Sequence, residues 1–140
     1  MHLYCSTYSN LTPPERQQVW LDILVALTQF ESGYDPTRSY TEPFNDSAGR
    51  PVISRGLLQI SQESANGYGC GITDANQLHD PRTNLQCGLK IASRWVKRDG
   101  VVAGGQNRNW LGMARYWSPF RNSKRDEIRA AVAGTPLCRR

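Results

Sequence analysis

One segment near the start of the chain constrains the fold most, because its ends and its interior all favour a long helix. Thr12 and Glu15 form a capping-box pattern, and the two prolines between them are tolerated in a first helical turn. Apolar residues then recur at helical spacing, at Trp20, Ile23, Leu24 and Leu27. Ser32-Gly33 supplies a stop, since glycine adopts the left-handed conformation that ends many helices. The sequence therefore predicts a helix that starts at this capping box and ends at Ser32-Gly33.

The rest of the chain predicts further helices around one irregular segment. Residues 34–55 are rich in proline, glycine and polar side chains, which is typical of a loop or a short hairpin. Cap and periodicity signals predict four more helical segments, namely 56–67, 80–100, 110–117 and 123–132. Within the segment 110–117, Trp110 and Trp117 fall at helical spacing with Met113 and are expected in the core. We expect a mainly α fold with a small loop or β-hairpin segment.

Length and charge restrict the class of protein. The chain has 140 residues, which suits one domain, and its longest apolar run, Leu21 to Leu27, is interrupted by Asp22. A membrane helix needs roughly 18 to 20 apolar residues, so no stable membrane insertion is expected. The net charge of +5 suits a polyanionic partner, although a merely solvated basic surface explains it equally well. Nucleic acid is disfavoured, because no basic run is interleaved with aromatic residues, and a monomer is expected.

The four cysteines indicate disulfides, because no two are spaced as a CxxC metal-binding pair. Their positions favour Cys5 with Cys138 and Cys70 with Cys87 among the three connectivities that four cysteines allow. Disulfides imply an oxidising compartment, yet the first residues lack the charged and apolar regions of a signal peptide. We expect either a domain excised from a longer protein or a protein that reaches its compartment by another route.

Glu31 is the strongest catalytic candidate. It lies at the end of the apolar face of the first helix, beside Phe30 and one turn from Leu27. Desolvation disfavours the charged form of a carboxylic acid, so a glutamate in such a place is suited to donate a proton near neutral pH. From its position alone, a glutamate that caps the helix end or forms an ion pair is the competing interpretation.

Three motifs in order extend this interpretation. They are Glu31-Ser32-Gly33, then Gly56-Leu57-Leu58-Gln59-Ile60, then Asp80-Pro81 with Asn84 and Gly88. Over roughly residues 15 to 118 the chain resembles the lysozyme-like superfamily, in particular lytic transglycosylase (SLT) domains and goose-type lysozyme relatives. The resemblance implies a lysozyme-like helical domain over 1–140, with peptidoglycan as the partner and with no metal or organic cofactor.

The resemblance also implies roles for individual residues. Glu31 becomes the catalytic acid, Ser32 a residue that supports it, and Gln59 part of the glycan groove. Tyr116 is a looser counterpart of a cleft-lining tyrosine, since the asparagine that follows it in the family is absent here. Exposed aromatic residues in polar loops suit sugar faces, and the candidates are Tyr40, Phe44 and Tyr68.

The segment between Glu31 and Gly56 is longer than in the common transglycosylase pattern and contains further carboxylates, at Asp35, Glu42 and Asp46. A second carboxylate that activates water makes such an enzyme a hydrolase. Without one, the sugar's own hydroxyl can attack, and the product is an anhydro sugar. We favour hydrolysis, with Glu42 as the second acid and Asp46 as the next candidate.

With this resemblance we expect a muramidase that cleaves the β-1,4 bond between N-acetylmuramic acid and N-acetylglucosamine. The alternatives are a lytic transglycosylase, a non-catalytic wall-binding module on the same fold, and an enzyme that acts on chitin or chitosan. An antibacterial effector domain is the favoured setting and a phage lysis or tail protein the alternative. Such an effector would be secreted or delivered to the bacterial periplasm or cell wall, and its expected protein partner is a cognate immunity or inhibitor protein.

Overall fold

The first long helix begins and ends as the sequence predicts. In the computed structural model, which describes residues 1–140, helix α1 spans Pro13–Ser32. The backbone N–H of Thr12 donates to the Glu15 carboxylate at 3.0 Å, and the backbone N–H of Glu15 donates to the Thr12 hydroxyl at 3.4 Å. Gly33 follows with φ +62°, so a glycine takes the left-handed position that ends the helix.

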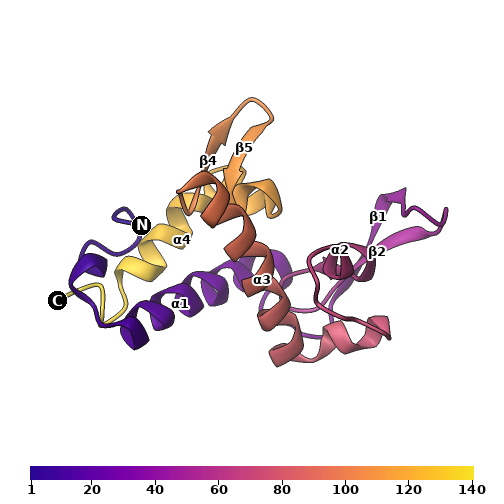
Figure 1. Cartoon of the computed structure of the whole chain (residues 1–140), viewed down its shortest axis with the longest axis horizontal. Helices are drawn as coiled ribbons and strands as arrows, with labels where there is room; N and C mark the ends of the chain where they lie inside the picture. The colour runs from indigo at the N-terminus through magenta and orange to yellow at the C-terminus, as the bar shows by residue number, and fades with distance from the viewer. The chain divides into compact units, whose positions relative to one another are not determined.

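The chain forms two compact units, and each is described by itself. The first unit comprises residues 1–30 and 94–140, and the second comprises residues 31–93. The other α-helices are α2 (Gln62–Gly67), α3 (Pro81–Asp99) and α4 (Lys124–Ala133) (Figure 1). The strands are β1 (Ser39–Asn45), β2 (Pro51–Arg55), β3 (Ile60–Ser61), β4 (Ala103–Gln106) and β5 (Asn109–Gly112). The short 3-10 helices are η1 (Tyr8–Asn10), η2 (Ala75–His79), η3 (Met113–Arg115) and η4 (Ser118–Arg121).

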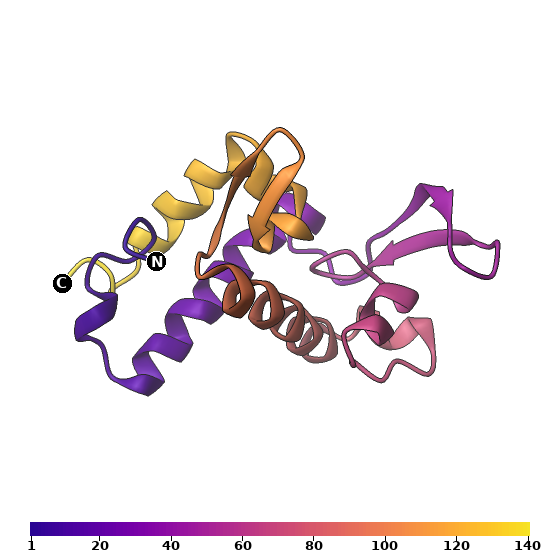
Figure 2. The same cartoon turned by 45° about the horizontal axis from the view of Figure 1, so that its top comes forward.

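The first unit is mainly helical and has an apolar interior. Its fully buried large side chains are Val19, Ile23, Leu27, Met113, Trp117, Phe120, Ile128 and Val132. The disulfide Cys5–Cys138 joins the two ends of the chain. Strands β4 and β5 form an antiparallel hairpin, which Figure 2 shows in full. None of the helices of this structure combines the length and the apolar content that crossing a membrane requires.

The second unit carries a three-stranded antiparallel sheet in the order β1-β2-β3. The hairpin of β1 and β2 projects beside α2, as Figure 1 shows in magenta. Leu58, Ile60, Leu78 and Ile91 are fully buried in this unit, and the disulfide Cys70–Cys87 joins the loop after α2 to α3. The hairpin occupies the segment 34–55 that the sequence marks as irregular.

Two predicted helices are wrong in part. Residues 56–61 form a turn followed by strand β3, and only the six residues of α2 after them are helical. Gly56 and Gln59 have positive φ values of 77° and 50°, which a helix does not allow. A Cβ at Gly56 would collide with the Leu78 carbonyl oxygen and the Asn84 amide. The close packing of this turn against Leu78 and Asn84 therefore outweighs the apolar pattern that predicted a helix here.

The helix predicted over residues 110–117 is instead strand β5 followed by the 3-10 helix η3. Asn107 and Arg108 have positive φ values of 51° and 71°, which suit the central residues of a two-residue hairpin turn. Trp117 is buried in the core as predicted, whereas Trp110 is only half-buried in β5. The helix predicted over residues 123–132 exists as α4, and the Asn122 side chain accepts from its first backbone N–H at 2.9 Å.

Asp99, the last residue of α3, joins three segments of the first unit. Its carboxylate accepts from Arg115 Nε at 2.7 Å and Nη2 at 2.9 Å, and from the Gly112 backbone N–H at 2.7 Å. The Arg115 hydrogen bond, and then the Gly112 one, lower the pKa of Asp99 to about 2. A lowered pKa stabilises the fold above the ordinary aspartate range near 4, and this stabilisation is lost as the pH falls towards about 2.

We therefore expect Asp99→Asn to lower the melting temperature by a few degrees at pH 7. The deficit should shrink as the pH falls from about 4 towards 2, because the wild-type carboxylate becomes protonated over that range. Thermal unfolding of both proteins across this range measures the effect. Asp126→Asn is the control, since Asp126 makes only an exposed pair with Arg129 at 3.6 Å. A deficit that does not change with pH would contradict the electrostatic role.

Candidate active site

A pocket of about 390 Å³ in the second unit brings together the two glutamates that the sequence favours. Its lining residues are Glu31, Arg38, Ser39, Tyr40, Glu42 and Gln59. Glu31 lies at the end of α1 and Glu42 in the middle of β1, and both are half-buried. The pocket therefore presents one carboxylate from a helix end and one from a strand, together with an aromatic side chain and an amide.

Glu42 is held by the neighbouring strand. Ser54 of β2 donates a hydrogen bond from its hydroxyl to Glu42 Oε1 at 2.8 Å, and Ser54 is only 7% exposed. Tyr40 pairs with Ser54 in the sheet register, and residues two apart in a strand point to the same face. Tyr40 and Glu42 both line the pocket, and Ser54 holds Glu42 from the neighbouring strand without lining the pocket itself.

Gln59 lines the same pocket as Glu31 and Glu42. Its side-chain Nε2 donates to the backbone carbonyls of Arg38 at 3.0 Å and Gly56 at 2.9 Å. The donor end of the amide therefore ties two backbone segments together, and the amide oxygen is the part suited to accept a hydrogen bond from a sugar hydroxyl. The prediction that Gln59 contacts the glycan rests on that oxygen.

The other two carboxylates of the irregular segment serve turns. Asp46 accepts from the backbone N–H groups of Ala48 and Arg50, each at 2.9 Å, and it lines a different pocket. Asp35 accepts from the hydroxyl and the backbone N–H of Thr37, and these hydrogen bonds lower its pKa. Of the three carboxylates of this segment, Glu42 is the one that lines the pocket of Glu31.

The remaining predicted binding residues have varied surroundings. Tyr40 and Phe44 are both 58% exposed on the hairpin, as a stacking surface for sugars requires. Tyr68 is half-buried after α2, and Ser32 is buried. Tyr116 belongs to the first unit, where its ring meets Trp117 edge to face at 4.9 Å. Their contacts with a glycan remain predictions.

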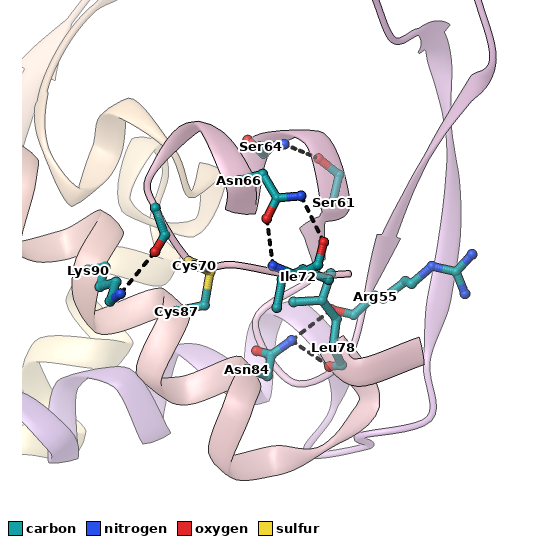
Figure 3. Close-up of a disulfide and its surroundings, with 11 residues drawn as sticks. Arg55, Ser61, Ser64, Asn66, Cys70, Ile72, Leu78, Asn84, Cys87 and Lys90 are labelled. Atoms are coloured by element: carbon teal, nitrogen blue, oxygen red, sulfur yellow. Dashed lines mark hydrogen bonds between the residues drawn. A yellow bond between two sulfur atoms is a disulfide. The ribbon is translucent and has the colours of Figure 1, made fainter. Parts of the chain in front are cut away.

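Asn84 belongs to the third sequence motif, and the structure shows what this residue does. The side chain is fully buried, accepts from the Leu58 backbone N–H, and donates to the carbonyls of Arg55 and Leu78, each at 2.9 Å. Figure 3 shows the two donated bonds. Asn84 therefore fixes the turn that leads to Gln59, which links the second motif to the third. The structure contains no group of three or more His, Cys, Asp or Glu side chains placed to hold a metal ion.

Comparison with known proteins finds one matching family model and a set of similar solved structures. A family model described as the transglycosylase SLT domain matches residues 11–117. No curated protein matches the chain. Three solved structures of a protein titled Bd0314 DslA are similar: an E154Q mutant, an E143Q mutant and a wild-type form. They are 46%, 46% and 47% identical to this chain, with TM-scores of 0.90, 0.89 and 0.89. Each match covers 97% of this chain and 76% of the other.

The matched family acts on the glycan strands of peptidoglycan, and the family model covers most of the helical core and the whole candidate site. The chain is thus an enzyme of the glycosidase or lytic transglycosylase type, and its mainly α fold with a β-hairpin is lysozyme-like. Taken together, the match over residues 11–117 and the similarity to the DslA structures show that the chain belongs to the transglycosylase SLT domain family of the lysozyme-like superfamily.

Proposed function

We propose that the chain is a muramidase that hydrolyses the β-1,4 bond between N-acetylmuramic acid and N-acetylglucosamine. The observation that carries this proposal is the pocket shared by Glu31 and Glu42. Glu31 acts as general acid and protonates the glycosidic oxygen as the bond to the anomeric carbon breaks. Glu42 accepts a proton from a water molecule while the oxygen of that water bonds to the same carbon.

The similar structures support the choice of these two glutamates. The two DslA mutants replace glutamates at positions 143 and 154 of that protein, which lie 11 residues apart. Glu31 and Glu42 also lie 11 residues apart, and no other two glutamates of this chain have that separation. The spacing favours Glu42 over Asp46 as the second carboxylate.

Transglycosylation is the second candidate, and the description of the matching family favours it. In that reaction a hydroxyl of the sugar itself attacks the anomeric carbon, so no water is consumed. Mass spectrometry of digested sacculi separates the two reactions. Reducing muropeptides are expected from hydrolysis, and products lighter by one water as the main species would overturn the proposal.

Ser54 is a positioning residue in this proposal, because it holds Glu42 without lining the pocket. A hydrogen bond to a charged group contributes about 1.5 to 3 kcal/mol, so Ser54→Ala should lower kcat about tenfold or more. KM should change little, because Ser54 does not contact the substrate. Ser54→Thr keeps the hydroxyl and should restore most of the rate.

Thr41→Ala is the matched control for Ser54→Ala, because Thr41 is an exposed residue of the same hairpin that does not line the pocket. Steady-state kinetics on soluble glycan chains measures both parameters. Equal losses in Ser54→Ala and Thr41→Ala would point to a general weakening of the hairpin and would contradict positioning.

Because its family acts on peptidoglycan, the chain acts in the periplasm or at the cell wall. We extend the proposal to an antibacterial effector domain that is delivered there and neutralised by a cognate immunity protein. The two disulfides and the net charge of +5 support an extracytoplasmic setting with an anionic polymer. Expression with an export signal in a Gram-negative host should cause lysis, whereas expression without one should not. Harmless export would contradict the effector role.

A further inference from the structure

A second pocket lies on the hairpin of β1 and β2, away from Glu31 and Glu42. It has a volume of about 420 Å³, which is within the range of small-molecule sites. Arg50 and Arg55 line it from the hairpin, and Glu63 and Asn66 line it from α2. Arg55 follows Ser54 directly in β2, so the two side chains point to opposite faces of the hairpin. The two pockets share no lining residue.

The two arginines are not neutralised by carboxylates. Arg50 and Arg55 take part in none of the ion pairs of the structure. Arg55 Nη1 lies 3.5 Å from His79 Nε2, and His79 Nδ1 lies 2.9 Å from the Pro36 carbonyl oxygen. Because a carbonyl only accepts, His79 Nδ1 donates to Pro36, and the ring is held beside the Arg55 guanidinium. His79 thus contacts the Arg55 guanidinium without a carboxylate, and the charge of Arg55 is left for a ligand.

The pocket also holds two carboxylates, which have hydrogen-bond partners but no cation. Asp46 accepts from the backbone of its own turn. Glu63 accepts from the Ser47 hydroxyl at 2.6 Å and from the Ser47 backbone N–H at 3.1 Å, which ties the hairpin turn to α2. With Arg50 and Arg55, the lining carries two positive and two negative charges. This balance fits a ligand that bears both signs of charge better than it fits a simple anion.

We propose that this pocket binds a zwitterionic amino acid group, with the carboxylate on Arg50 and Arg55 and the ammonium on Asp46 and Glu63. Uncrosslinked peptides of the bacterial wall carry such a group where a diamino acid keeps its free amine beside a free carboxylate. The inference rests on peptidoglycan as the substrate polymer. The pocket would hold a wall peptide on the back of the hairpin that carries Glu42, and would favour uncrosslinked wall.

A binding titration by NMR or calorimetry tests the proposal. The probe is a synthetic stem tripeptide that ends in meso-diaminopimelate, added to the full chain carrying Glu31→Gln. The Arg50→Ala/Arg55→Ala double variant should weaken binding about tenfold or more, because it removes a charge-assisted contact. Acetylation of the free amine of the peptide should weaken binding to a similar degree. Arg82→Ala is the control, since Arg82 is exposed on α3 and lies outside this pocket.

Three outcomes would overturn the proposal: equal binding to the double variant, no effect of acetylation, or displacement of the peptide by acetate alone at equal concentration. Arg55→Lys separates a folding defect from a binding defect, because it keeps the charge and loses the planar fork. Cleavage of peptide-free glycan strands should be unchanged in the double variant. That assay reports on the pocket of Glu31 and Glu42, which shares no lining residue with this one, so a failure of the proposed hydrolysis is distinguishable from a failure of this site.

Discussion

Replacing Glu31 by glutamine should reduce the release of muropeptides from purified sacculi by about a thousandfold or more, since general acid catalysis alone contributes roughly 10² to 10⁴. The amide is nearly the same size as the carboxylic acid but cannot give up a proton to the glycosidic oxygen. The leaving sugar would then depart as an alkoxide, which is a poor leaving group. The loss should appear in kcat, with the affinity for the wall largely kept.

The control for this variant is Glu127→Gln, which removes a carboxylate from the exposed surface of α4, where it pairs with Lys124 at 3.2 Å. Its activity should stay close to that of the wild type. Circular dichroism and the melting temperature of Glu31→Gln should also match the wild type, because glutamine preserves the volume of the side chain. A Glu31→Gln protein that clears sacculi at the full rate would refute the assignment of the acid.

Local signals in the sequence predict the long helix α1 well and the segments fixed by distant contacts less reliably. The capping box at Thr12 and Glu15 and the stop at Gly33 act within one turn of chain, so α1 is recovered from sequence alone. The region from Gly56 to Ile60 is different, because its backbone is determined by contacts with the Asn84 side chain from α3. Such a contact between segments distant in sequence leaves no periodicity in the sequence.

The residues of the candidate site also differ in whether local sequence signals or contacts between distant segments determine their positions. Glu31 is predictable because its helix and its motif are local, and Glu42 is predictable as one of three carboxylates in an irregular segment. The choice between Glu42 and Asp46 needs the folded hairpin, whose register is irregular after Thr41: Glu42 lines the pocket of Glu31, and Asp46 accepts from the backbone of the turn. Ser54 could not be chosen without that register, because its link to Glu42 exists only across two paired strands.

Replacing Glu42 by glutamine should change both the rate and the product. Hydrolysis should fall about a hundredfold or more, because the amide cannot take a proton from water. Glu31 still assists the breaking of the glycosidic bond, so attack by the sugar's own hydroxyl competes better with the slowed attack of water. Products lighter by one water should therefore form a larger share of the digest of Glu42→Gln than of the wild type. Mass spectrometry of time-matched digests gives both quantities in one experiment.

Asp35→Asn is the matched control for Glu42→Gln, since Asp35 lies in the same irregular segment and its turn with Thr37 needs only an oxygen acceptor, which asparagine retains. It should leave the rate and the products unchanged. Full activity of Glu42→Gln would show that Glu42 takes no part in the reaction. Anhydro products already dominant in the wild type would mean that the pocket does not activate water, and that Glu42 serves the glycan in another way. The share of anhydro product therefore decides between a hydrolase and a transglycosylase on the same pair of glutamates.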